Sequence, residues 1–187
     1  MLLLAFGNKA RHGKDTAGEA VVEHFNFQRG ILKRHYGTNI ARPAAKLFKF
    51  ADALYREARE LHGMTEKDAP LLQRVGTERR TENPNYWIDR VFEQIDAFNP
   101  EVAVLTDLRY VNEALAVKAR GGFTVNVSRL DSLGFPYVAT DRDPNHSSET
   151  ALDSYRFDFF IKANSGDSAL VAQQAITIAE YVKGLMS

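Results

Sequence analysis

The stretch FGNKARHGKDTAGE, residues 6–19, places glycine, lysine and hydroxyl side chains at a spacing suited to holding phosphate. Such a loop needs glycine where its backbone turns to aim N–H groups at the anion, and a lysine that reaches the terminal phosphates. Gly13 and Lys14 stand at these positions, between an apolar run and a stretch of helical period. The pattern predicts a phosphate cradle; a Gly-Lys turn with ordinary surface charges is the alternative.

Two positions depart from the strict pattern of a phosphate-binding loop. Asn8 replaces the first glycine, and Asp15 replaces the hydroxyl that usually touches magnesium, although Thr16 follows directly. Asparagine adopts left-handed backbone angles more readily than other non-glycine residues, so it is compatible with the turn. The residues that we expect to contact nucleotide phosphates are Asn8, Lys9, Ala10, Arg11, His12, Gly13, Lys14, Asp15 and Thr16.

A second candidate site lies in VAVLTDLRYVNEA, where Asp107 directly follows an apolar run. In doubly wound sheets ligands bind at the carboxyl ends of the strands, where the Lys14 loop also lies. Asp107 there is suited to holding magnesium or orienting the attacking group, and Arg109 to binding a phosphate in bidentate fashion. A simple Asp turn is the alternative. For Asn112 and Glu113, helix capping and substrate contact both remain open.

The elements that must position these residues follow from the hydrophobic pattern. Strand-length apolar runs occur at residues 2–6, 102–105, 123–127 and 157–161, with a weak strand pattern at 31–40. Helical spacing occurs at residues 14–25, 47–61, 87–98, 111–120 and 171–185. This alternation predicts parallel strands with crossover helices in a layered α/β fold. Residues 130–145, rich in Asp, Pro and Gly, predict a long mobile loop, and loops of this length tend to be functional lids or disordered segments.

Composition narrows the class of protein. The chain has 187 residues and 44% hydrophobic content, which suits a single domain. It has no cysteine, so disulfides and cysteine-ligated metals are excluded. Its 24 basic and 24 acidic residues cancel, which argues against a nucleic-acid polymer or an anionic membrane as partner. With no run near the ~20 apolar residues of a membrane span, we expect a soluble cytoplasmic protein.

Four blocks of sequence together resemble the deoxynucleoside monophosphate kinases of bacteriophages. They are GKDT in the loop, LLQRVGTE at 71–78 followed by Trp87, DLRYVNEA at 107–114, and HSSETAL at 146–152. The similarity runs along most of the chain, to the NSG of residues 164–166. Asn8 and His12 depart from the family, which commonly has serine before GKDT.

The resemblance implies a fold and an activity. The fold would be a three-layer α/β/α P-loop NTPase domain over residues 1–187, with a parallel central sheet, a helical acceptor-binding region at about 42–98 and a mobile lid at about 129–147. The activity would be Mg²⁺-dependent transfer of the ATP γ-phosphoryl to a deoxynucleoside monophosphate, giving the diphosphate and ADP. The location would be the host cytoplasm, if the chain is encoded by a phage.

The resemblance also implies roles for individual residues. Lys14 would span the β- and γ-phosphates, Arg11 would lie near the transferring group, and Asp107 and Arg109 near the acceptor phosphate. Arg129 and Arg142 would be lid arginines, and metal contacts would come from Asp15, Thr16 and Asp107. The acceptor would be bound by Lys46, Arg74, Thr77, Glu78, Arg79, Arg80, Trp87, Arg109, Asn112 and Glu113. Asn164, Ser165 and Gly166 would lie against adenine.

Simpler explanations exist for several of these residues, and other functions remain open. Arg74, Arg79 and Arg80 fall in a charged helix whose side chains are ordinarily solvated, and Trp87 has the spacing of a core residue. The rival functions are a P-loop kinase for dephospho-coenzyme A or phosphomevalonate, and an ATP-binding regulatory protein without catalysis. A kinase of nucleic-acid ends is disfavoured by the balanced charge. The sequence leaves base preference and a homodimer undecided.

Overall fold

The computed structural model describes residues 1–36, 44–140 and 143–186 of the chain. Within these residues a five-stranded parallel sheet has the order β2-β3-β1-β4-β5. The strands are β1 (Leu2–Gly7), β2 (Ala45–Phe48), β3 (Val102–Leu108), β4 (Phe123–Leu130) and β5 (Phe159–Asn164). The central strands are buried on both faces, which explains why they are nearly continuous apolar runs.

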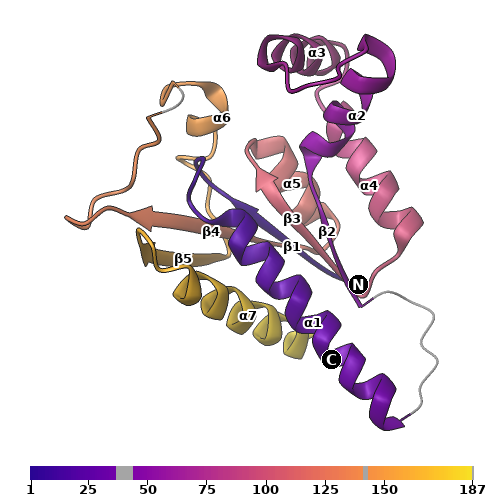
Figure 1. The fold of residues 1–187 in the computed structure, drawn as a ribbon, viewed down its shortest axis with the longest axis vertical. Helices are drawn as coiled ribbons and strands as arrows, with labels where there is room; N and C mark the ends of the chain where they lie inside the picture. The colour runs from indigo at the N-terminus through magenta and orange to yellow at the C-terminus, as the bar shows by residue number, and fades with distance from the viewer. Residues whose placement is uncertain (37–43, 141–142, 187) are drawn as a thin grey trace.

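Helices cover both faces of the sheet (Figure 1). On one face lie α1 (Lys14–Tyr36) and α7 (Ser168–Leu185), which contact each other; on the other lie α4 (Tyr86–Phe98) and α5 (Val111–Ala119). Two further helices, α2 (Phe50–His62) and α3 (Ala69–Glu82), form a helical region with α4 beyond the ends of the strands, and α6 (Ser147–Thr150) is a single turn. The predicted three-layer α/β/α architecture is confirmed.

The core is divided between the two faces by the alternation of side chains along the strands. Leu4 and Phe6 of β1 pack with residues of α1 and α7, whereas Leu3 and Ala5 pack with residues of α4 and α5. Because successive strand residues point to opposite faces, one apolar strand serves both layers. The loop that follows β1 is therefore attached to a strand that is packed on both faces.

The chain order places a crevice at the carboxyl ends of β1 and β3. These strands are neighbours in the sheet, with Gly7 opposite Leu108, yet α1 follows β1 on one face and α5 follows β3 on the other. Ligands of open α/β sheets bind at such switch points. The loop at residues 8–13 and the segment 107–110, which includes the last two residues of β3, flank this crevice.

Several predicted element boundaries are wrong. The strand expected at 102–105 extends to Leu108, so Asp107 lies within β3 rather than beyond it. Residues 31–36, expected in a weak strand, continue α1, because basic residues in its last turn suit the negative end of the helix dipole. Leu47, expected in a helix, belongs to the short edge strand β2. The strand expected at 157–161 spans Phe159–Asn164 instead. The rest of the weak strand pattern, up to residue 43, lies outside the described residues.

The predicted lid segment begins as a hairpin after β4. Tyr137 donates its backbone N–H to Arg129, Asp131 donates to Phe135, and Leu130 forms an antiparallel bridge with Pro136. In Figure 1 this orange segment extends away from the sheet before the chain returns to α6. Arg142, a predicted lid arginine, lies outside the described residues.

Two further features concern the outside of the molecule. The edge strand β5 is covered at Lys162, whose backbone N–H and C=O both pair with the side-chain amide of Gln174 on α7, at 3.4 and 3.2 Å. In the part of the chain that the structure describes, no helix combines the length and apolar character needed to cross a membrane.

Candidate active site

The loop after β1 has the backbone conformation of an anion cradle. Gly13 has φ of +92° and Arg11 of +60°, so successive N–H groups turn toward one side ahead of α1. Asn8, in place of the first glycine, adopts φ of +114°, a strained angle for a residue with a side chain. Its Nδ2 lies 3.1 Å from acceptors on Asn126, Val127 and Ser128 of β4. These contacts explain how asparagine holds the turn.

Lys14 is buried at the start of α1 and folds back over the loop. Its Nζ donates to the backbone carbonyls of Asn8 and Lys9, at 3.0 and 2.5 Å. Burial, helped by the nearby Arg109 guanidinium, lowers the pKa of Lys14 to about 7. An anion bound in the cradle would stabilise the positively charged form of Lys14. Lys9 itself turns aside to an ion pair with Asp153 at 3.2 Å.

His12 fastens the loop to the hairpin. Its Nδ1 accepts the backbone N–H of Arg129 at 3.1 Å, so its Nε2 carries the proton and donates to the carbonyl of Tyr137 at 2.9 Å. Burial lowers the pKa of His12, which keeps the ring neutral as this pattern requires. Arg129 in turn donates to the Ser165 hydroxyl at 2.8 Å and lies over the Tyr137 ring. The lid hairpin, the loop and the 164–166 turn are thereby linked.

Asp15 occupies the first turn of α1 with one oxygen engaged. Its Oδ1 accepts the hydroxyl of Thr106 at 2.8 Å and lies 2.7 Å from the ammonium of Lys49. Although burial acts in the opposite direction, the hydrogen bonds from Lys49 and Thr106 lower the pKa of Asp15. The carboxylate is therefore ionised and exposed at the position where a hydroxyl usually serves the metal.

Asp107 caps α2 from a distance. Its two oxygens accept the backbone N–H groups of Phe50 and Ala51 at 2.9 and 2.8 Å, which replaces the missing side-chain cap at Lys49. Burial raises the pKa of Asp107 in spite of these bonds. These bonds are not the local Asp turn that the sequence left as an alternative, because Asp107 caps a helix that is distant in the sequence. A metal role for Asp107 stays a prediction.

Arg109 is held by one edge of its guanidinium. Its Nη1 donates to Glu149 at 2.9 Å and to the carbonyls of Asn8 and Ser148 at 3.2 and 3.4 Å. Glu149, whose side chain is 5% exposed, also accepts the backbone N–H of Ala10 at 2.7 Å. The buried carboxylate therefore fixes Arg109 against the loop. Sequence reasoning missed Glu149 as a functional residue, although it lies in the HSSETAL block.

Glu113 and Asn112 act at the start of α5. Glu113 Oε2 accepts the backbone N–H groups of Arg109 and Tyr110 at 2.8 and 3.0 Å, completing a capping box. Burial raises the pKa of Glu113 to about 7. Asn112 donates to the Pro84 carbonyl at 2.9 Å. Of the two alternatives left open for these residues, the structure shows capping and packing contacts; substrate contact stays a prediction.

A cavity of about 730 Å³ unites the two halves of the predicted site. It lies at the crevice between β1 and β3, and its lining includes residues from four parts of the chain. They are Ala10, Arg11, His12, Gly13, Lys14, Asp15 and Thr16 of the loop and α1, Lys49, Ala51 and Tyr55 around the start of α2, Lys67, and Thr106, Asp107 and Arg109 at the end of β3 and just after it. Lys49, Tyr55 and Lys67 had not been selected from the sequence; the position of Lys49 at the carboxyl end of β2 was the available signal.

A second, smaller cavity of about 220 Å³ opens on the other side of the loop. It is lined by Arg11, His12, Gly13, Thr16, Arg129, Asn164 and Gly166, together with the first residues of α7. Loop residues therefore line both cavities. The structure brings Arg129 and the 164–166 turn together with the loop, and Asp167 caps α7 through the N–H of Leu170.

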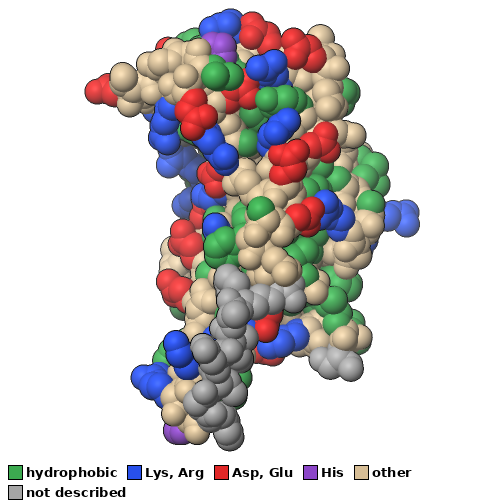
Figure 2. All heavy atoms as spheres, turned by 90° about the vertical axis from the view of Figure 1, so that its right-hand side faces the viewer, with side chains coloured by type: hydrophobic (Ala, Val, Ile, Leu, Met, Phe, Trp, Pro, Cys, Tyr) green, Lys and Arg blue, Asp and Glu red, His purple; other side chains and the backbone are tan. Residues whose placement is uncertain are grey.

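Most predicted acceptor residues lie outside both cavities. Lys46 places its ammonium 3.8 Å from the centre of the Phe98 ring. Arg79 pairs with Glu57 at 2.6 Å, and Arg80 donates to the Gly76 carbonyl at 3.2 Å. The remaining predicted residues of α3 are Arg74, Thr77 and Glu78, which line a shallow outer surface where Arg74 pairs with Glu78 at 3.3 Å. Figure 2 shows acidic and basic side chains mixed over the face formed by the helical region.

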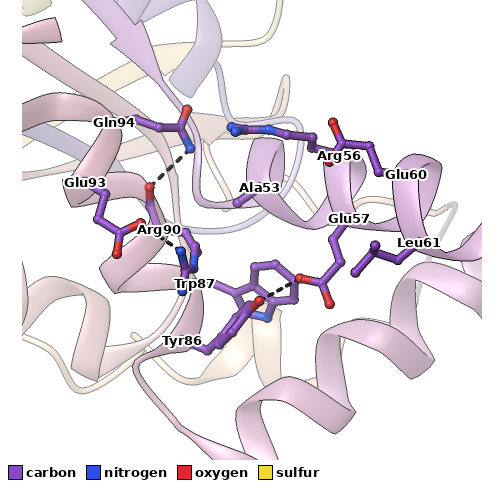
Figure 3. Close-up of a pocket in the computed structure, with 10 residues that line it drawn as sticks. All are labelled: Ala53, Arg56, Glu57, Glu60, Leu61, Tyr86, Trp87, Arg90, Glu93 and Gln94. Carbon is purple, nitrogen blue, oxygen red and sulfur yellow. Dashed lines mark hydrogen bonds and ion pairs between the residues drawn. The ribbon is translucent and has the colours of Figure 1, made fainter. Parts of the chain in front are cut away.

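Trp87 is a core residue, as its helical spacing suggested. It is 2% exposed and donates its indole N–H to the Gly76 carbonyl at 3.3 Å. It borders a cavity of about 340 Å³ between α2 and α4, shown in Figure 3, where Glu57 accepts the Tyr86 hydroxyl at 2.8 Å. The charged residues around this cavity are of both signs, so it presents no single charge to a ligand.

The residues of the larger cavity fit a magnesium ion that is carried mainly by nucleotide phosphates. Asp15 and Thr16 offer hard oxygen ligands at the cradle, and Mg²⁺ at such sites takes one or two protein ligands beside phosphate and water. Among the described residues no group of three or more His, Cys, Asp or Glu side chains is placed to hold a metal unaided. The fit therefore depends on the nucleotide.

Comparison with known proteins gives a weak match of the overall fold. No protein-family model matches the chain, and no curated protein matches it either. Among solved structures, the APS kinase of Mycobacterium tuberculosis in complex with AMPPNP and APS is 14% identical, with a TM-score of 0.45 over 97% of both chains. Shikimate kinase from Aquifex aeolicus is 14% identical, with a TM-score of 0.43 over 100% of both chains. Similarity at this level supports no conclusion about activity.

Proposed function

We propose that the chain is an ATP-dependent P-loop phosphotransferase that phosphorylates a deoxynucleoside monophosphate. The observation that carries the proposal is the cavity at the β1–β3 crevice, which unites a glycine-lysine anion cradle with Arg109 and a further set of cations. A cradle alone would bind phosphate. A cradle that faces additional cations across one cavity is suited to two phosphorylated ligands.

The donor would lie along the loop between the two cavities. Backbone N–H groups around Gly13 and the ammonium of Lys14 would hold the β- and γ-phosphates, at the positive end of α1. The smaller cavity, beside the 164–166 turn, would receive the base. Arg129, held between Ser165 and the Tyr137 ring, borders that cavity and would add positive charge beside the phosphates.

Transfer would depend on positioning and charge, because phosphoryl transfer needs little covalent chemistry from the protein. Mg²⁺, when bound with the nucleotide, supplies charge neutralisation at the phosphates. Arg109 presents the guanidinium edge that Glu149 leaves unoccupied, and it would orient the acceptor phosphate. The His12 link between loop and hairpin would keep water from the transferring group when the hairpin covers the site.

The deoxynucleoside monophosphate is proposed on the strength of the four sequence blocks rather than on the cavity. Release of ADP should be measured by a coupled assay with each common deoxynucleoside monophosphate, and with dephospho-coenzyme A and phosphomevalonate in parallel. We expect turnover with at least one deoxynucleoside monophosphate. Turnover only with another acceptor would refute this substrate. ATP binding without any acceptor-dependent ADP release would favour the regulatory alternative.

A further inference from the structure

Two lysines that the proposed donor does not need line the larger cavity. Lys49 follows β2 directly and stands at the start of α2, whereas Lys67 lies in the connection between α2 and α3. Tyr55, one turn after Ala51 on α2, brings a phenol ring to the same wall. This group of Lys49, Tyr55 and Lys67, here called the β2-side wall, faces the cavity from the helical region.

Lys67 is available to an anion. Its side chain is exposed, and its ammonium makes no ion pair with any of the described residues. Lys49 is different, since it already lies 2.7 Å from Asp15 next to the donor cradle. One lysine thus borders the donor site, and the other extends the positive charge toward the helical region.

The balance of charge in the cavity leaves room for a second anion. Its lining carries five basic side chains, Arg11, Lys14, Lys49, Lys67 and Arg109, against the two carboxylates of Asp15 and Asp107. Lys49 is paired with Asp15, and Arg109 with Glu149. Both oxygens of Asp107 are committed to backbone N–H groups of α2. Positive charges that line one cavity attract anionic ligands and stabilise them when they are bound.

Three of the cations that the sequence assigned to the acceptor make contacts with other side chains instead. Lys46 lies over Phe98, Arg74 pairs with Glu78, and Arg79 pairs with Glu57. None of these three borders the cavity. An acceptor bound through them would lie away from the donor cradle, whereas transfer requires the reacting atoms to be almost in contact.

We propose that the β2-side wall is the acceptor subsite, in which Lys67 and Lys49, together with Arg109, bind the phosphate of a monophosphate ester. The proposal deepens the proposed function, on which it rests for the nature of the ligand. It replaces the sequence-based assignment to Lys46 and to the arginines of α3. Lys67, which has no ion-pair partner among the described residues, is the residue that tests it.

The test is calorimetric titration of the four common deoxynucleoside monophosphates into the wild type and single variants. Lys67→Ala should raise the Kd of the bound monophosphate about tenfold, because one charge-assisted contact is lost. Lys67→Arg should restore binding to within about threefold, because the positive charge is kept. The Kd of ATP should stay within about twofold in both, which a general loss of structure would not allow. Lys33→Ala, an exposed lysine at the end of α1, is the matched control.

The outcomes separate the subsite from the activity. Unchanged monophosphate binding in Lys67→Ala, or a loss in Arg74→Ala instead, overturns the subsite, and so does an absence of monophosphate binding to the wild type. If Lys67→Ala loses monophosphate binding but the wild type releases no ADP, the subsite stands and the activity fails. If the wild type turns over and the acceptor KM of Lys67→Ala is unchanged, the activity stands and the subsite fails.

Discussion

Glu149 and Arg109 form a partly buried ion pair of 2.9 Å that joins α6 to the residues that follow β3. The same carboxylate accepts the N–H of Ala10 in the phosphate-binding loop. One side chain therefore fixes three parts of the site that are distant in sequence. The pair also restrains Arg109, a residue that lines the cavity, since it engages Nη1 of the guanidinium.

Glu149→Gln should destabilise the protein by about 2 kcal/mol, because it leaves the partly buried charge of Arg109 without its partner. Glu78→Gln is the matched control, since Glu78 pairs with Arg74 on an exposed surface, and it should cost less than about 1 kcal/mol. Urea unfolding of both variants gives the two free energies. Equal losses would show that the buried pair contributes no more than a surface pair.

Binding of ATP near pH 8 should be accompanied by uptake of nearly one proton at Lys14. The pKa of its ammonium is about 7 in the free protein, so the group is largely neutral at pH 8, and polyphosphate would raise that pKa again. Calorimetry in buffers of different ionisation enthalpy measures the uptake. Lys14→Met should lose both the uptake and tight binding of ATP; an equal uptake in this variant would assign the proton to another group.

His12 should make the protein less stable in acid. Its pKa is lowered in the folded state, so below the unfolded value of about 6.5 the unfolded chain binds more protons and stability falls as the pH falls. His12→Ala should therefore cost more stability at pH 7.5 than at pH 5, by urea unfolding. His62→Ala, at the exposed end of α2, should change stability by under about 0.5 kcal/mol at either pH. A cost of His12→Ala that does not vary with pH would contradict the neutral ring.

Gly18→Ala should destabilise the protein by roughly 1–3 kcal/mol and disturb the contact between Thr106 and Asp15. A Cβ at Gly18 would lie 2.2 Å from Cγ2 of Thr106, whose hydroxyl holds Asp15. Gly30→Ala, on the same helix, would meet nothing within 4 Å and should stabilise by up to about 1 kcal/mol. Thermal unfolding compares the two variants. A neutral Gly18→Ala would mean that β3 and α1 can move apart at no cost.

The sequence predicts the parallel sheet, the loop and the meeting of Lys14 with Arg109, because the carboxyl ends of parallel strands lie at one edge of the sheet. Burial and periodicity are local signals, and each of these features follows from them. The short strand β2 was hidden, since four residues at an edge carry little pattern. Its absence from the prediction concealed Lys49, whose significance depends on following that strand.

The direction of side chains in the helical region could not be predicted in the same way. Charges occur around much of α3, and which of its faces meets the cavity depends on how α2, α3 and α4 pack. Arg79 pairs with Glu57 of α2 and lies over the ring of Tyr86 of α4, contacts that depend on how three helices pack together. Which basic side chains are available to a ligand therefore depends on how these helices pack, which the sequence pattern does not show.

The amide of Gln174 imitates the peptide group of an absent neighbouring strand beside Lys162. Because the backbone groups of Lys162 are already paired, another chain could extend the sheet past this residue only by displacing Gln174, which discourages strand exchange at this point of the edge.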